Sequence, residues 1–224
     1  MFPSLAAAAI LTAAASLPNL APAAPTNPWP DSFVARLAAL AQIQQLNADL
    51  LSHDSATATL QHWCDTHGNA AGLRITAQRL RGQDKPADAT VRAALGARAD
   101  EALGYRRVRL ACGARVLSEA DNWYRPARLT PEMNRLLEAT DTPFGVVVKA
   151  LDYRRRTLAS EVLWRPLPQD WETLPRPADV PGATLVIPRE LLRHRAILAT
   201  PDGTPFSLVA ETYTEEILFR PAEF

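Results

Sequence analysis

Residues 105–116 read YRRVRLACGARV and give the clearest strand pattern in the chain. Apolar side chains at every second position share one face, and these are Val108, Leu110 and Cys112. A period of two is typical of a strand with one buried face and one polar face. Gly113 is placed for a turn, and residues 120–124 are predicted to return as the antiparallel partner of a hairpin.

The segments on either side of this hairpin predict helices first and then mostly strands. The predicted helices cover residues 32–51, 54–67, 131–138 and 144–150. The further predicted strands cover residues 73–78, 153–164, 195–200 and 205–219. Residues 82–103 are predicted as a loop with a short helix, and the proline-rich residues 166–181 as irregular. This order favours an α+β fold with an antiparallel β-sheet.

The N-terminal residues are typical of a targeting segment. Residues 1–30 contain no charged side chain, residues 6–17 are mostly apolar, and residues 21–23 read Ala-Pro-Ala. We therefore predict a signal peptide over residues 1–23, a Pro-rich linker over residues 24–31, and a single domain over residues 32–224. If the leader is cleaved, the protein is periplasmic or secreted; the alternative is an Ala/Pro tail on a cytoplasmic protein.

Composition and motifs exclude several classes of function. Lys+Arg and Asp+Glu balance at 24 each, so we expect no nucleic-acid partner and no stable membrane insertion after leader removal. Neither a nucleotide-binding glycine motif nor a metalloprotease motif is present. His62 and His67 are five residues apart on a predicted helix, too far around it to share a metal, and Ser52-His53-Asp54 is too contiguous for a catalytic triad. We therefore expect no metal and no cofactor.

The sequence contains two cysteines, Cys64 and Cys112, and leaves their state open. In an oxidising compartment they would be able to form a disulfide, and otherwise they would serve as small buried apolar side chains.

Four segments, in this order along the chain, carry a resemblance to a known family. They are LLSHDSAT at residues 50–57, RVRLAC at 107–112, TPFG at 142–145 and GTPFSLVAE at 203–211. Together they resemble chorismate pyruvate-lyase, the bacterial enzyme that makes 4-hydroxybenzoate for ubiquinone biosynthesis. The resemblance implies a chorismate-lyase-like α+β domain, with helical flaps over a buried ligand cavity. It also implies a carbon–oxygen lyase that needs no cofactor and converts chorismate, or a related aromatic acid, to 4-hydroxybenzoate and pyruvate.

The same resemblance assigns roles to residues. Arg107 would bind the ring carboxylate and Glu211 would meet the 4-hydroxyl, as the two catalytic residues. The backbone at Ala56 and Phe144 would close the pocket, with Arg109 as a candidate second cation. Asn122 would line the pocket where the family has an arginine.

Three departures from the family motifs favour a second hypothesis. Asn122 and Val146 stand where the family has arginines, and Ala56 replaces a flap methionine. With fewer arginines, the chain would be a non-catalytic exported protein that binds a small aromatic carboxylate, and we expect a monomer. A third interpretation, a structural protein without a cavity, places Arg107 and Glu211 in water. Alternation leaves Arg107 and Arg109 open to the solvent face, whereas Glu211 lies among apolar neighbours and would need a partner.

Overall fold

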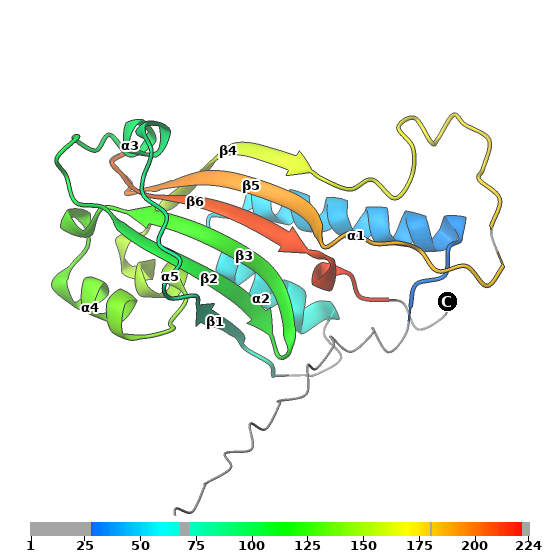
Figure 1. Cartoon of the computed structure of the whole chain (residues 1–224), viewed down its shortest axis with the longest axis horizontal. Coiled ribbons are helices and arrows are strands. Elements are labelled where there is room, and N and C mark those ends of the chain that lie inside the picture. The colour runs from blue at the N-terminus through cyan, green and yellow to red at the C-terminus, as the bar shows by residue number, and fades with distance from the viewer. Residues whose placement is uncertain (1–27, 68–71, 180, 221–224) are drawn as a thin grey trace, which may run out of the picture.

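The structure, a computed structural model, describes residues 28–67, 72–179 and 181–220. Its framework is a curved six-stranded antiparallel sheet with the order β1-β2-β3-β6-β5-β4 (Figure 1). The strands are β1 (Ile75–Arg79), β2 (Gly104–Cys112), β3 (Arg115–Tyr124), β4 (Arg154–Val162), β5 (Glu190–Ala199) and β6 (Pro205–Thr214). The predicted α+β class with an antiparallel sheet is confirmed.

The hairpin at the centre of the sequence forms as the alternation predicts, with a shorter first strand. β2 ends at Cys112, and Gly113 takes φ +60° in the turn, a backbone conformation that glycine adopts without strain. β3 then returns antiparallel to β2. The strand predicted at residues 195–200 begins earlier, at Glu190, and the last strand ends at Thr214 in a 3-10 turn over Glu215–Ile217.

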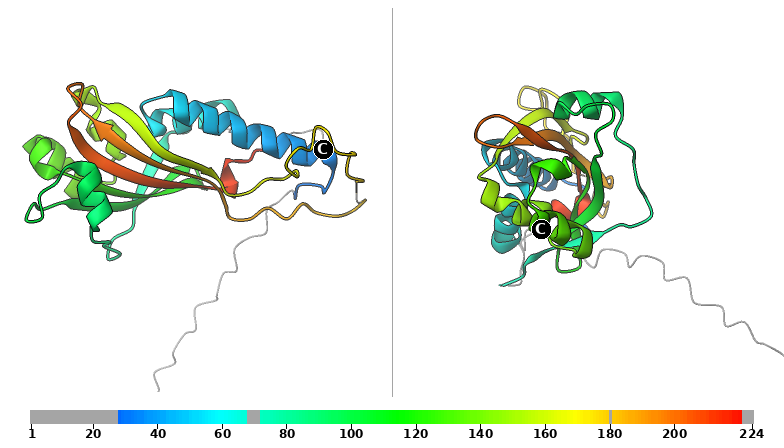
Figure 2. Two further views of the ribbon diagram at one scale, coloured as in Figure 1. Left: turned by 90° about the horizontal axis from the view of Figure 1, so that it is seen from above. Right: turned by 90° about the vertical axis from the view of Figure 1, so that its left-hand side faces the viewer.

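Within the described ranges, five α-helices cover the two faces of the sheet. They are α1 (Phe33–Ser52), α2 (Ala56–His67), α3 (Ala89–Leu95), α4 (Pro131–Ala139) and α5 (Phe144–Val147). α1 and α3 lie on opposite sides of the sheet (Figure 2). We call the face that carries Glu211 the inner face; α1, α2, α4 and α5 cover it, and α3 packs on the opposite, outer face.

Local sequence explains where α1 and α4 begin on the inner face. Ser32 accepts a hydrogen bond from the backbone N–H of Ala35 and so caps α1, and Thr130 accepts one from Met133 at the start of α4. The core side chains of α1 recur at three- and four-residue spacing, and these are Ala35, Ala39, Ile43, Leu46 and Leu50. Burial of this stripe fixes α1 against the sheet.

A disulfide joins α2 to β2. It links Cys64 to Cys112, two residues that are both buried. Of the two states that the sequence left open, the structure therefore contains the bonded one. The predicted signal peptide (residues 1–23) and the linker up to residue 27 lie outside the described residues.

Candidate functional site

The inner face carries a buried ion pair between β4 and β6. Nη2 of Arg155 lies 2.5 Å from Oε2 of Glu211, and the two side chains are 3% and 8% exposed. Both residues are held on this face by the register of their strands, which pairs them with Leu198 and His194 of β5. Burial disfavours the charged form of Arg155. The carboxylate of Glu211, together with other neighbouring groups, outweighs this effect of burial and raises the pKa of the guanidinium.

Two further polar side chains surround this pair. The hydroxyl of Tyr213 donates to Oε2 of Glu211 at 3.2 Å, and burial raises its pKa well above the usual range. His194 is fully buried, and burial lowers its pKa to about 4, so its ring is neutral near pH 7. Nε2 of His194 lies 2.8 Å from Oδ1 of Asn47 on α1, an acceptor, which assigns the ring proton to Nε2.

The cluster contains one donor and one acceptor that are not used. Within the described part of the chain, neither Nε of Arg155 nor Nδ1 of His194 has a hydrogen-bond partner, and both atoms are buried. Buried polar atoms normally have partners because their desolvation is costly. This face of the sheet therefore retains unused hydrogen-bonding capacity beside a charged pair.

Two short segments cover the cluster at one end of the sheet, and we call them the cover. The first is residues 53–57, which run from the end of α1 into the first turn of α2, and the second is residues 142–147, which includes α5. A Cβ at Gly145 would lie 3.0 Å from Oη of Tyr153 and 3.3 Å from Oγ1 of Thr57, so the two segments meet closely. Oδ1 of Asp54 accepts a hydrogen bond from the backbone N–H of Arg155 at 2.7 Å, which ties the first segment to β4.

Arg106 of β2 holds the start of the second segment of the cover through hydrogen bonds to its backbone. Its side chain is only 1% exposed and donates to the carbonyl oxygens of Thr140 and Thr142 at 3.2–3.3 Å. Burial lowers the pKa of Arg106 to about 10, which leaves it charged at neutral pH. A charged donor on two turn carbonyls is a strong positional constraint on this segment.

A hollow of about 530 Å³ opens beside the cover, at the junction of α1 and α2. It is lined by Asp49, His53, Asp54, Ser55, Ala58, Thr59 and His62. Ser55 and Asp54 belong to the cover as well, so the hollow and the cover share a wall. Among the described residues, no group of three or more His, Cys, Asp or Glu side chains is placed to hold a metal ion.

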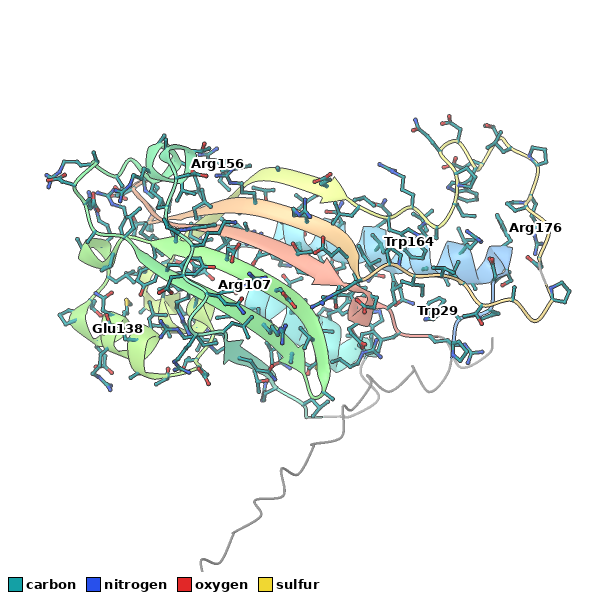
Figure 3. The ribbon with its side chains drawn as sticks, viewed as in Figure 1. Trp29, Arg107, Glu138, Arg156, Trp164 and Arg176 are labelled. Atoms are coloured by element: carbon teal, nitrogen blue, oxygen red, sulfur yellow. A yellow bond between two sulfur atoms is a disulfide. The ribbon has the colours of Figure 1, made fainter. Side chains whose placement is uncertain are left out.

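The structure separates the two residues predicted as catalytic. Arg107 pairs with Asp121 in the register of β2 and β3, whereas Glu211 pairs with Ala120, so the two side chains lie on opposite faces. Figure 3 shows Arg107 on β2, where it is 38% exposed and contacts Glu119 and Asp121. The expectation that Arg107 and Glu211 share one closed cavity is therefore wrong.

The other predicted site residues are divided in the same way. Arg109 lies on the outer face and binds Glu119 at 3.1 Å. Asn122 is buried on the inner face, where its Oδ1 accepts from Ser207 at 2.7 Å. Ala56 is buried in the cover, and Phe144 lies with its ring 5.6 Å from that of Tyr124.

Sequence reasoning missed the arginines that do point inward. Arg106 is two residues before Val108 and therefore shares its face, so the alternation already contained this signal. Arg155 lies two residues after the buried Tyr153, but only the strand order shows that Glu211 is within its reach. The ion pair thus depends on topology, which local spacing does not determine.

Comparison with known proteins places the chain in a family. No protein-family model matches it. The chain is 48% identical to the uncharacterized protein y4mC of Sinorhizobium fredii over 195 residues, which cover 87% of this chain and 82% of that protein. The chain belongs to the y4mC family.

Solved structures show a likeness of fold to this y4mC-family chain. PhnF from Mycobacterium smegmatis matches with a TM-score of 0.49 and 14% identity, over 75% of this chain and 67% of that chain. The ligand-binding domain of a protein assigned to the GntR family of transcriptional regulators, from Bordetella bronchiseptica, matches with a TM-score of 0.42 and 18% identity. That match covers 70% of this chain and 93% of the domain.

These findings correct the functional predictions for the y4mC-family chain. Membership of the chorismate pyruvate-lyase family is wrong, because the matching domain from Bordetella bronchiseptica belongs to a protein assigned to the GntR family of transcriptional regulators. The predicted lyase activity on chorismate and the role in ubiquinone biosynthesis are also wrong. The alternative prediction, an exported binder for a small aromatic carboxylate, is wrong as well. The physical reason is that Arg107 lies on the outer face, away from Glu211, so the two residues do not form the predicted catalytic site.

The partner predictions are corrected in part. Exclusion of nucleic acid does not hold, because the Bordetella bronchiseptica domain comes from a protein assigned to a family of transcriptional regulators. The matching domain from Bordetella bronchiseptica is a ligand-binding domain. In the part of the chain that the structure describes, no helix has both the length and the apolar character needed to cross a membrane.

Proposed function

We propose that this chain is a regulatory small-molecule-binding domain whose ligand presents an anionic group to Arg155 on the inner face. The observation that carries the proposal is the buried Arg155–Glu211 pair with its unused hydrogen-bonding atoms under a two-segment cover. The ligand would replace Glu211 as the partner of Arg155 or add to it through the free Nε.

The cost of the ion pair supports a functional interpretation. Two charges removed from water are often no more stabilising than apolar side chains of the same volume. A binding site, by contrast, needs a charge that is already desolvated and oriented, because the ligand then gains a strong hydrogen bond without ordering the protein. Arg155 has both properties, since its side chain is 3% exposed and one of its nitrogens has no partner among the described residues.

The cover supplies a route for the ligand. Its two segments meet through small groups, with Gly145 beside the hydroxyls of Thr57 and Tyr153, and the hollow beside them shares Ser55 and Asp54. Asp54 also binds the backbone of Arg155, so a movement of residues 53–57 reaches the ion pair directly. We place ligand entry at this hollow.

The local hydrogen bonds favour binding over catalysis. Ser160 and His194 lie 3.1 Å apart, which is the distance expected between a nucleophile and its base. However, the hydroxyl of Ser160 donates to Asn47 at 2.8 Å, and His194 carries its proton on the nitrogen that faces both residues. A neutral histidine with its proton at that position does not activate the serine.

A thermal-shift screen tests this function. Purified residues 28–224 would be incubated at pH 7 with citrate, succinate, glucose 6-phosphate and glycerol 3-phosphate, with the uncharged sugar glucose as control. A ligand at a hundred times its Kd stabilises a fold by about 2.7 kcal/mol, which raises the melting temperature by several degrees in a domain of this size. We expect such a rise for at least one anion and none for glucose.

Two variants assign the rise to the inner face. Arg155→Met combined with Glu211→Leu removes both charges and is expected to fold but to lose the response. Arg156→Met changes the exposed neighbouring arginine on the same strand and should keep it. A response retained by the double variant, or no response to any anion, would overturn the proposal.

We propose separately that the protein reaches an oxidising compartment, as residues 1–23 predict. The Cys64–Cys112 disulfide supports this location because such bonds persist where thiols are not kept reduced. Thiol alkylation in whole cells, followed by mass spectrometry of residues 64 and 112, would test it. Alkylated cysteines without prior reduction would contradict it.

A further inference from the structure

The outer face of the sheet gathers three arginines around one carboxylate. Oε1 of Glu119 lies 2.5 Å from Nη2 of Arg189 and 3.1 Å from Nε of Arg109. Oε2 of the same side chain lies 3.4 Å from Nη2 of Arg107. The three guanidinium groups come from β2 and from the segment before β5, so residues far apart in the sequence meet here. Burial opposes the charge on Glu119, but the arginines together lower the pKa of its carboxyl.

The acidic neighbours are engaged elsewhere. Glu190 accepts a hydrogen bond from Arg193 at 3.1 Å. Asp121 accepts from Lys85 at 3.3 Å and from the hydroxyl of Tyr105 at 2.7 Å, while its distance to Arg107 is 4.0 Å. When these pairs are set aside, Glu119 balances one of the three guanidinium charges and leaves an excess of positive charge.

These arginines line a hollow of about 510 Å³, which we call the outer groove. Its wall also includes Gln83, Thr212 and Glu190. This volume falls within the range of small-molecule sites. Arg107 and Arg109 are 38% and 37% exposed and Arg189 is 65% exposed, so their unused N–H groups are accessible from solvent.

We propose that the outer groove binds a small organic polyanion, a molecule with two or more carboxylate or phosphate groups. Guanidinium groups bind both kinds of oxyanion through paired N–H donors, and the hydroxyl and amide groups supply further polar contacts. A single anionic group would compete poorly with Glu119, whereas a polyanion would engage Arg107 and Arg189 at the same time. The site is separate from the inner-face cluster because the sheet lies between the two.

Isothermal titration calorimetry in 50 mM salt tests the proposal with defined probes. Citrate and pyrophosphate carry several anionic groups, and acetate and inorganic phosphate are their simpler counterparts. We expect citrate or pyrophosphate to bind at least about tenfold tighter than the simpler counterpart, since a second charge-assisted contact contributes on that scale. The better of the two probes distinguishes a carboxylate ligand from a phosphate ligand.

Three variants locate the binding. Arg109→Gln combined with Arg189→Gln should weaken polyanion binding about tenfold or more. Glu119→Gln should strengthen it, because the internal competitor loses its charge. Arg135→Gln on α4 removes an arginine of similar exposure that binds Glu132, and it should leave the affinity unchanged.

The opposite results would overturn the proposal. These are equal affinity for the polyanion and its simpler counterpart, or equal loss of affinity in the Arg135 control and the double variant. Weaker binding after Glu119→Gln would also contradict it. Binding of duplex DNA without binding of either polyanion would assign the groove to a nucleic acid instead. Circular dichroism of each variant confirms that these surface changes leave the fold intact.

Discussion

Arg155 of β4 and Glu211 of β6 form a hydrogen-bonded ion pair across β5, the strand that lies between theirs in the sheet. The pair therefore links β4 to β6 on the inner face. Neither residue has another charged partner at this distance among the described residues. Each is therefore the charged partner of the other in a buried place, which leads to the first prediction.

Removal of one partner should cost far more stability than removal of both. Arg155→Met alone leaves Glu211 buried and unpaired, and we expect a loss of about 3–5 kcal/mol in the free energy of unfolding. Arg155→Met with Glu211→Leu should lie close to the unmodified protein, because apolar side chains fill the same volume. Urea unfolding at pH 7 measures both. Equal destabilisation of the single and double variants would contradict the coupling.

Stability should fall as the pH is lowered from about 6.5 to about 4, in part through His194. Burial lowers its folded-state pKa to about 4, whereas an unfolded histidine has a pKa near 6.5. In this window the unfolded chain takes up the proton and the folded chain does not, so unfolding is favoured by up to about 3 kcal/mol. Carboxylates with a lowered pKa, such as Glu119, also make the folded protein less stable as the pH falls.

A comparison of two histidine variants separates the contribution of His194 from that of the carboxylates. His194→Gln should reduce the change in unfolding free energy between pH 7 and pH 5, and His53→Gln, at an exposed position, should not. The same pH response in both variants would mean that His194 is not the group responsible.

Reduction of the disulfide should destabilise the domain. Cys64 and Cys112 are separated by 48 positions, and closing a loop of this size in the unfolded chain contributes about 2–4 kcal/mol. We expect dithiothreitol to lower the melting temperature by several degrees. The Cys64→Ala, Cys112→Ala double variant should melt near the reduced protein and should not respond to dithiothreitol. A response of the double variant would show that the reagent acts elsewhere.

Gly145→Ala should loosen the cover. The added methyl group would lie 3.3 Å from Oγ1 of Thr57 in the other segment and 3.0 Å from the hydroxyl oxygen of Tyr153, so these neighbours must move away by a few tenths of an ångström. We expect faster hydrogen exchange in residues 53–59 and a cost of about 1 kcal/mol, which is typical of a small overpacking change. Val146→Ala shortens the exposed neighbouring side chain and is the control. Unchanged exchange in Gly145→Ala would argue against a close contact between the segments.

The fold was more predictable from the sequence than the site. Alternation in residues 105–112 and the apolar spacing in residues 32–51 are local signals, and each produced an element near its expected position. Glu211 was singled out because a carboxylate among apolar neighbours needs a partner, and it has one.

The identity of that partner was beyond local reasoning. Arg107 was chosen for its spacing from Cys112 in a family motif, although the alternation itself placed Arg107 opposite Leu110 and Cys112. The true partner, Arg155, comes from a strand two positions away in the sheet. Strand order follows from how the whole chain packs, so no short motif contains it.

The disulfide has a consequence for the connectivity of the molecule. Residues 64–112 form a covalently closed ring that contains β1, α3 and the whole of β2. A protease that cuts the exposed residues 81–86 once would divide the backbone but release no fragment. The helices before the cut and the strands after it would remain joined through sulfur, and only a reducing agent would separate the two polypeptides.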